Sequence, residues 1–287
     1  MPAEVSIMEK RFLSDALLAK FRECLVLEEK SEATVKKYIR DIKNFICFAR
    51  SGEIGKETVI KYKKYLQKNH AAQSVNSMLA GINCFFTSLG WYELKVKPLK
   101  LQQKVFCPEE RELSKAEYIR LCCEAKRRHN ERLNLILQTI CGTGIRISEL
   151  QYITVEAANR GEAIVSCKSK TRSVFIVREL KQKLLRYAAE QRIKSGMIFV
   201  TQTGKPVDRT NIWREMKSLC KEAGVNPQKV FPHNLRHLFA REFYKTEKDI
   251  AKLADVLGHS SISTTRIYII STGTEHRRQM ENMHLII

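Results

Sequence analysis

Apolar residues recur every three or four positions along most of the chain, which is the spacing of helices that bury one face. The clearest case is SEATVKKYIRDIKNFICFA, residues 31–49, where Ser31 stands at the position of an N-cap. The residues on its apolar face are Val35, Tyr38, Ile39, Ile42, Phe45, Ile46 and Ala49. Further helices are expected over KETVIKYKKYLQKN, over AQSVNSMLAGINCFFTSLGW and repeatedly after residue 113. The sequence therefore predicts a mainly α-helical protein.

The helical pattern stops between Glu93 and Glu112 and then resumes. The stretch LKVKPLKLQQKVFCPEE contains two prolines and four lysines but no apolar face. Just after it, Ser114 and Glu117 have the spacing of a capping box, which marks the start of a new helix. A chain of 287 residues is long enough to bury two cores. We therefore expect an N-terminal helical domain at 1–93, a basic linker at 94–112 and a larger domain at 113–287.

A small antiparallel β-sheet is expected inside the larger domain. AIVSC and SVFIV are short runs rich in β-branched residues, and KSKTR between them would form the basic tip of a hairpin. MIFVTQTGKPV has the composition of a strand edge followed by a turn, and helices resume from Asp208. The predicted fold class is mainly α with a small antiparallel β-sheet.

The charge of the chain favours a polyanionic partner. Lys and Arg together number 51 against 31 Asp and Glu, which gives a net charge of +20 and a pI near 9.6. No run of about twenty apolar residues could span a membrane, and the first residues lack the order of a secretory signal. Nine cysteines without a C-x-x-C pair indicate a reduced, cytoplasmic protein, not a disulfide framework.

The stretch HNLRH, residues 233–237, has two chemical interpretations. His233 and His237 lie four apart and could bind a metal ion, but Asn234 replaces the acidic residue of the H-E-x-x-H zinc motif. Arg236 also places a permanent cation between the two histidines, which disfavours a divalent metal. His233 and Arg236, three apart on one helix face, could instead bind a phosphate, or they could simply be exposed polar residues. No metal site is predicted.

Other residues that bind or attack phosphate groups occur elsewhere in the chain. Arg146 follows a Gly-x-Gly turn at the head of a predicted helix, where an anion is stabilised. Lys168 lies on the predicted hairpin, His259 follows Gly258, and Tyr268 lies nine residues beyond His259. Each is a weak indication alone, because a hairpin lysine is usually solvated and a tyrosine in an apolar stretch usually packs. Only their combination points to phosphodiester chemistry.

Three motifs, TGIRISEL, HNLRHLFA and LGHSSISTTRIY, resemble in order and spacing the tyrosine recombinase (phage integrase) family, which includes the Xer, Cre and lambda-integrase types. The resemblance covers nearly the whole chain, and residues 1–93 resemble the family's SAM-like core-binding domain more loosely. It implies these catalytic residues: Arg146, Lys168, His233, Arg236, His259 and the nucleophile Tyr268. Glu149 matches an acidic position that supports the histidine in the family, and Lys170 stays an alternative to Lys168. His237 matches no catalytic position, and core packing is expected for it.

The resemblance implies a site-specific DNA recombinase that cleaves and rejoins strands through a 3′-phosphotyrosyl intermediate, with no cofactor. In such chemistry two arginines bind the phosphate, a histidine accepts the tyrosine proton, and a lysine protonates the leaving 5′ oxygen. The two domains would clamp double-stranded DNA. The basic residues expected to contact it are Lys97, Lys100, Lys104, Lys170, Arg172 and Arg209.

The resemblance also implies a homo-tetramer on paired sites with short inverted repeats. The apolar tail MENMHLII is expected to dock on a neighbouring subunit, with docking on its own domain as the alternative. The first domain begins close to Met1, which leaves no room for the arm-binding domain of lambda-type integrases, so we expect a simple recombinase from a mobile element or an invertible switch. Integration, inversion and dimer resolution stay open. A monomeric type IB topoisomerase and a regulator that only binds DNA are the competing interpretations.

Overall fold

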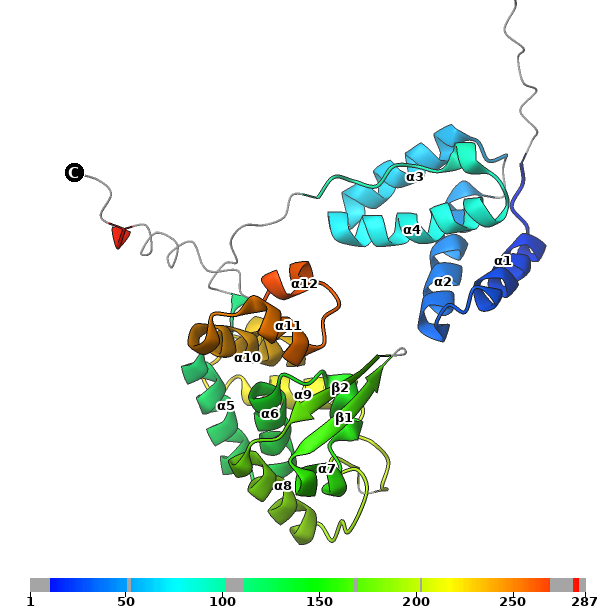
Figure 1. Ribbon diagram of the computed structural model, residues 1–287. Coiled ribbons are helices and arrows are strands. Elements are labelled where there is room, and N and C mark those ends of the chain that lie inside the picture. The colour runs from blue at the N-terminus through cyan, green and yellow to red at the C-terminus, as the bar shows by residue number, and fades with distance from the viewer. Residues whose placement is uncertain are drawn as a thin grey trace, which may run out of the picture. The chain divides into compact units, whose positions relative to one another are not determined.

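The computed structural model describes residues 11–50, 53–101, 111–167, 170–201, 203–268 and 281–283. The chain forms two compact units, Met1–Gln103 and Lys104–Ile287, each with its own hydrophobic core (Figure 1). The described residues are mainly helical and contain one two-stranded antiparallel sheet, so the predicted fold class is confirmed. None of the described helices is both long enough and apolar enough to cross a membrane.

The first unit is a small helical bundle. Its elements are α1 (Asp15–Leu27), α2 (Glu32–Ala49), α3 (Lys56–Asn69), α4 (Ala72–Ser88) and the 3-10 turn η1 (Tyr92–Leu94). Helix α2 begins where the sequence predicts, because the Ser31 hydroxyl accepts the Thr34 amide and caps its first turn. Helices α2 and α4 pack against each other, and the core between the helices is rich in phenylalanine: Phe21, Phe45, Phe85 and Phe86.

Two asparagines of α4 hold the extended chain that follows η1. Asn83 Oδ1 accepts the amide of Val96 at 3.0 Å, and Asn83 Nδ2 donates to the carbonyl of Val96 at 2.8 Å. Asn76, two helical turns earlier, binds Leu99 in the same paired way, at 2.7 and 2.9 Å. An asparagine side chain carries an N–H donor and a C=O acceptor, as a peptide group does. The two asparagines of α4 therefore bond to the extended segment in the way that a neighbouring β-strand would.

The first residues of the segment predicted as a linker, 94–112, pack on the first unit. Leu94 and Val96 are buried in the core of the first unit, and the Nζ of Lys63 on α3 donates to the Lys97 carbonyl at 2.7 Å. Periodicity could not show this, because the segment is fixed by side chains 13 to 34 residues away in the sequence. Residues 102–110, which include Lys104, lie outside the described residues.

Replacement of Asn83 by Ala tests this attachment. The change removes both hydrogen bonds to Val96, so we expect the free energy of unfolding of the first unit to fall by about 1–3 kcal/mol. Urea unfolding followed by the fluorescence of Trp91, in a Trp213→Phe background, measures it. Ser74→Ala, at an exposed position of the same helix, is the matched control and should leave the midpoint unchanged.

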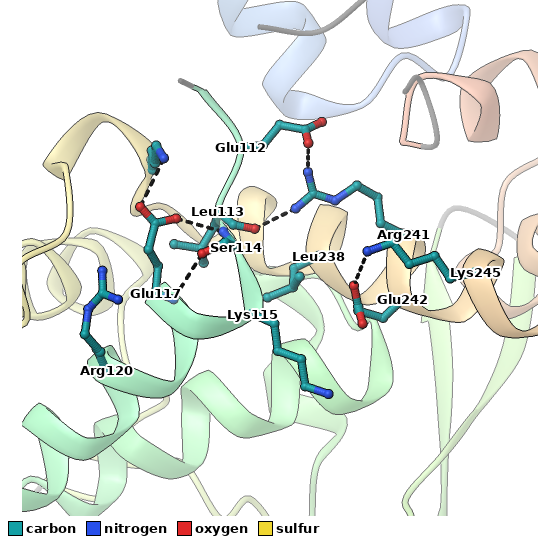
Figure 2. A pocket seen from close by; sticks show the side chains of 11 residues that line it. Glu112, Leu113, Ser114, Lys115, Glu117, Arg120, Leu238, Arg241, Glu242 and Lys245 are labelled. Carbon is teal, nitrogen blue, oxygen red and sulfur yellow. Dashed lines mark hydrogen bonds and ion pairs between the residues drawn. The ribbon is translucent and has the colours of Figure 1, made fainter. Parts of the chain in front are cut away.

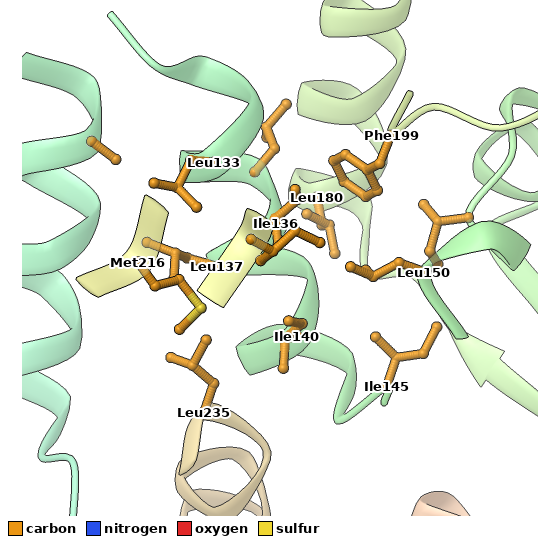
Figure 3. Packing of buried hydrophobic residues seen from close by; sticks show 14 of the residues in the cluster. Leu133, Ile136, Leu137, Ile140, Ile145, Leu150, Leu180, Phe199, Met216 and Leu235 are labelled. Carbon is orange, nitrogen blue, oxygen red and sulfur yellow. The ribbon is translucent and has the colours of Figure 1, made fainter. Parts of the chain in front are cut away.

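Helix α6 (Glu131–Thr143) is the central helix of the second unit. It is buried on nearly all sides, and four helices pack around it: α5 (Lys115–Arg127), α8 (Arg178–Glu190), α9 (Arg209–Leu219) and α10 (Pro232–Glu247). Figure 3 shows Leu137 and Ile140 of α6 in one cluster with Met216 of α9 and Leu235 of α10. The predicted capping box before α5 is confirmed by the reciprocal hydrogen bonds of Ser114 and Glu117.

The sheet is longer than predicted, and its tip is shorter. Strands β1 (Glu162–Cys167) and β2 (Lys170–Phe175) follow the 3-10 helix η3 (Ile147–Tyr152) and α7 (Val155–Arg160). Arg172 pairs with Val165 inside the ladder, so KSKTR is not a tip of five residues. Alternation along the strand puts Arg172 on the same side as the buried Val174. The stretch MIFVTQTGKPV forms isolated bridges and no strand among its described residues.

The second unit ends, as far as the structure describes it, in short helices. The 3-10 turn η4 (Pro227–Lys229) precedes α10. Two short helices follow α10: α11 (Ile250–Leu257) and α12 (Ile262–Arg266). Tyr268 follows α12 directly and is buried. The C-terminal tail expected to dock on a neighbour lies outside the described residues, apart from positions 281–283.

Candidate active site

A fully buried arginine organises the region where the predicted catalytic residues meet. The side chain of Arg236, on α10, is 1% exposed. Its Nη1 donates to the carbonyl of Gly144 at the end of α6, and its Nη2 donates to the carbonyl of Leu257 at the end of α11, at 2.6 Å. The carbonyl end of a helix carries partial negative charge, so two helix ends offset the cost of burying this cation.

The loop after α11 brings His259 to the same guanidinium. Gly258 ends α11 with φ +65°, and His259 Nε2 then lies 3.0 Å from Arg236 Nη2. The other ring nitrogen, Nδ1, lies 2.9 Å from Oγ1 of the buried Thr265 on α12. Because an arginine can only donate, Nε2 is the acceptor and Nδ1 carries the proton in this arrangement.

The predicted nucleophile lies in the same cluster. The hydroxyl of Tyr268 is 3.2 Å from Nε2 of His233, and the Arg236 guanidinium lies 5.9 Å from the centre of the Tyr268 ring. His237, for which the sequence predicts only packing, stacks on that ring at 4.2 Å between centroids and 20° between planes. Its position one turn after His233 on α10 is the sequence feature that could have indicated this contact.

Arg146 and Glu149 lie beside this cluster, but not as the sequence predicts. Glu149 Oε2 accepts the backbone amide of Arg146 at 2.9 Å, so the chain's own carboxylate occupies the head of η3, where an anion was expected. Glu149 Oε1 accepts from Nη1 of Arg146 at 2.8 Å, and Oε2 also accepts from Nη2 of Arg172 at 2.6 Å. Glu149 therefore supports two arginines and not a histidine. The Arg146 side chain keeps 37% of its surface exposed.

Arg172, expected to contact DNA, lies inside this network. Its side chain is 12% exposed, and its Nη1 donates to the carbonyl of Val256 at 2.8 Å. Both terminal nitrogens thus have protein acceptors. Lys168, the expected general acid, lies outside the described residues, and Lys170 is described only as the first residue of β2. Lys97, Lys100 and Arg209 are exposed, as a contact with DNA requires.

A surface pocket of the second unit lies away from this cluster. It has a volume of about 580 Å³ between α5 and α10 and contains none of the predicted catalytic residues. Figure 2 shows that its charged side chains pair with one another, Glu112 with Arg241 and Glu242 with Lys245. A second groove, about 400 Å³, lies on the first unit and is lined by five lysines, Lys56, Lys63, Lys64, Lys95 and Lys97. No group of three metal-binding side chains occurs in the described ranges.

Comparison with known families identifies the chain. Residues 111–275 match the phage integrase family, and residues 17–94 match the phage integrase N-terminal SAM-like domain. The chain belongs to the phage integrase family. It is therefore a tyrosine recombinase, an enzyme of site-specific recombination that cleaves and rejoins DNA strands.

Relatives of this family match almost the full chain. Tyrosine recombinase XerA of Pyrococcus furiosus is 26% identical over 286 residues, which cover 97% of this chain and 98% of the relative. The crystal structure of XerH recombinase in a post-cleavage complex with a palindromic difH substrate has a TM-score of 0.72 at 17% identity, covering 95% of this chain and 84% of that one. The Tn1549 transposon integrase with transposon right end DNA has a TM-score of 0.70 at 16% identity, covering 93% and 98%. At these identities the structures show a shared fold.

Burial and the neighbouring arginines lower the pKa values of the histidines in this cluster. The pKa of His259 falls to about 4, because its ring is partly removed from water and because Arg236 and Arg146 are close. The pKa of His233 is lowered by the same kinds of cause, burial first and then Arg236 and Arg146. Burial and the charge of Arg146 also lower the pKa of Arg236, to about 10, which leaves it charged at neutral pH. Arg146 and Arg172 share the carboxylate of Glu149, and the partners of Arg236 are neutral, so the described residues of this cluster carry an excess of positive charge.

Gly258 is a point where this geometry can be tested. A Cβ there would lie 2.2 Å from Cδ of Arg172, and its left-handed φ costs any other residue about 1–2 kcal/mol. We therefore expect Gly258→Ala to lower the free energy of unfolding by more than Gly204→Ala, which has a similar φ but open space around it. Urea unfolding measures both. In an Arg172→Ala background the excess cost should disappear; if it persists, the predicted overlap is not its cause.

Proposed function

We propose that the residues around Tyr268 form the site in which this recombinase breaks one DNA strand and holds it as a 3′-phosphotyrosyl ester. The observation that carries the proposal is the position of the Tyr268 hydroxyl, 3.2 Å from His233 of the same chain and beside the Arg236 guanidinium. The tyrosine oxygen attacks phosphorus, the bond from phosphorus to the 5′ oxygen breaks, and the energy of that bond is kept in the ester. Cleavage thus occurs with the nucleophile of the same subunit.

The arginines are proposed to bind the scissile phosphate. Nε of Arg236 is buried and has no acceptor among the described residues, so a phosphate oxygen would complete its hydrogen bonding. Arg146 is half-exposed and uses only Nη1 toward Glu149, so the rest of its guanidinium is free for a second oxygen. Fixed guanidiniums stabilise the negative charge that gathers on the phosphate oxygens during attack.

The two histidines are proposed to act in different protonation states. His233 accepts the phenolic proton on Nε2, which its lowered pKa keeps unprotonated at neutral pH. His259 would donate a hydrogen bond to the phosphate, but its Nε2 accepts from Arg236 in the free enzyme. A bound phosphate brings negative charge that raises the pKa of His259, so we infer that His259 becomes a donor only when DNA is bound.

Lys168 is proposed to protonate the leaving 5′ oxygen, with Lys170 as the alternative. The hairpin supports this, because the β1–β2 ladder ends at the pair of Cys167 and Lys170, and Lys168 follows Cys167 in the sequence. Lys97, Lys100, Lys104 and Arg209 are proposed to contact the phosphate backbone while the two domains clamp the duplex. Glu149 and Arg172 are proposed to hold Arg146 and the end of α11 in place.

The biological reaction is proposed to be exchange between two short inverted-repeat sites by a homo-tetramer in the cytoplasm. The family and the palindromic substrate of the XerH complex support paired sites, and the transposon integrase supports a mobile element. The domain limits 1–93, 94–112 and 113–287 and the docking of the C-terminal tail on a neighbour are part of the same proposal. Dimer resolution of the Xer type is the alternative, supported by the match to XerA.

Tyr268→Phe tests the nucleophile. Without the hydroxyl no phosphotyrosyl bond can form, so the variant should bind DNA normally but give no covalent adduct on a nicked suicide substrate. Denaturing gel electrophoresis detects the adduct. Tyr244→Phe removes the hydroxyl of a tyrosine that packs against the same apolar cluster as Tyr268; it is the control and should give adduct at close to the unmodified rate. Adduct formed by Tyr268→Phe would overturn the assignment.

Lys168→Ala tests the general acid. Its cleavage rate should fall by about 10²–10⁴-fold on a normal phosphodiester, because the leaving oxygen lacks a proton donor. A 5′-bridging phosphorothiolate leaves without a proton, so it should restore most of the rate. Single-turnover cleavage of both substrates is the measurement. If the phosphorothiolate restores the cleavage rate of Lys170→Ala but not that of Lys168→Ala, Lys170 is the general acid.

A further inference from the structure

The ring of Tyr268 is held by aromatic contacts from one face of α10. His237 stacks nearly parallel on it, with centroids 4.2 Å apart and 20° between the planes. His233 meets the edge of His237 at 4.9 Å and the edge of Tyr268 at 5.3 Å. The three rings form one group in which His237 contacts the other two.

Two further side chains contact the ring of Tyr268: His259, at 5.0 Å between ring centroids, and Arg236, whose guanidinium lies 5.9 Å from the ring centre. Tyr268 itself has few backbone constraints on its orientation. It follows α12, a helix of only five residues, and its backbone amide bonds to the carbonyl of Thr265. The apolar contacts of its ring come from a small cluster with Ala240, Leu253 and Leu257. A tyrosine ring can rotate about χ1, so something beyond this backbone must hold the hydroxyl toward His233.

His237 uses the face of its ring and not its nitrogens. No described residue forms a hydrogen bond with either nitrogen, although the ring is largely buried. Burial first, and then the charges of His233 and Arg236, lower the pKa of His237 to about 4, so the ring is neutral at physiological pH. A neutral imidazole next to Arg236 adds no further cation to a site already rich in arginine, and offset stacks of neutral rings are favourable.

We propose that His237 is a positioning residue for cleavage: its ring is the platform on which Tyr268 lies, with the hydroxyl directed to His233 and to the phosphate. The inference rests on the proposed function, because it assumes that Tyr268 is the nucleophile. It assigns His237 no proton transfer and no contact with DNA. The effect of His237 on the rate passes through the orientation of Tyr268 alone.

His237→Ala, His237→Leu and His237→Phe separate stacking from other roles. Loss of the platform in the Ala variant should slow adduct formation on a suicide substrate by about 10–100-fold, because misplacement of a reacting atom by about 1 Å costs on the order of 10² in rate. Phe restores a flat ring without nitrogens and should bring the rate back to within a few fold, whereas Leu fills space without a flat face and should not. DNA binding and thermal unfolding are measured for each variant. His70→Ala, an exposed histidine of the first unit, is the control.

A second measurement bypasses the tyrosine. In a Tyr268→Gly background, hydrogen peroxide is the external nucleophile: its oxygen attacks phosphorus, and the 5′ oxygen leaves with a proton. His237→Ala should not change this peroxide-driven rate, since no tyrosine remains to be positioned. A Phe variant as slow as Ala, or an equal loss in the peroxide reaction, would overturn the positioning role. Adduct formation by Tyr268→Phe would instead overturn the proposed function, so the two failures are distinguishable.

Discussion

The buried guanidinium of Arg236 is the interaction on which the catalytic unit depends. A lone buried cation costs several kcal/mol, and here the carbonyl ends of α6 and α11 offset that cost. Both carbonyls must point at one group, so the arginine fixes how α6, α10 and α11 meet. Gly144 and Gly258 end these two helices with φ +65°, and an added Cβ at either position would overlap a neighbouring side chain. The same contacts that stabilise the fold thereby set the geometry of the phosphate site.

The charge balance around Arg236 is consistent with the proposed binding of a phosphodiester. Arg146 and Arg172 share Glu149, and Arg236 has only neutral partners. Burial, and then this positive charge, lower the pKa values of His259 and His233. Nε of Arg236 has no acceptor among the described residues. A phosphate group of a DNA strand would supply both the missing acceptor and the missing negative charge. The proposed phosphate site thus has an excess of positive charge before any anion binds.

Some basic side chains of this protein bond to the protein itself, and others are exposed to solvent. The amino-acid composition does not distinguish the two groups. Lys63 bonds to a backbone carbonyl of the extended segment after η1, and Arg172 bonds to Glu149 and to Val256. These cations stabilise the protein itself. Lys97 and Lys100 of the first unit and Arg209 of the second are exposed, and each is proposed to contact DNA. A net charge of +20 thus overstates the charge available to a nucleic acid.

The sequence by itself determined the features that depend on neighbouring residues: the helix that starts at Ser31, the capping box at Ser114 and the mainly helical class with a small sheet. The order of the motifs also indicated the family. Only the tertiary structure decided the partners of Arg172 and Glu149, the attachment of Val96 to Asn83, and the stack of His237 on Tyr268. Except for the capping of Arg146 by Glu149, these contacts join residues from 13 to more than 30 positions apart, so no local pattern encodes them. The periodicity of apolar residues identifies which face of a helix is buried. Which side chains pack against that face depends on residues distant in the sequence, and only the folded structure shows them.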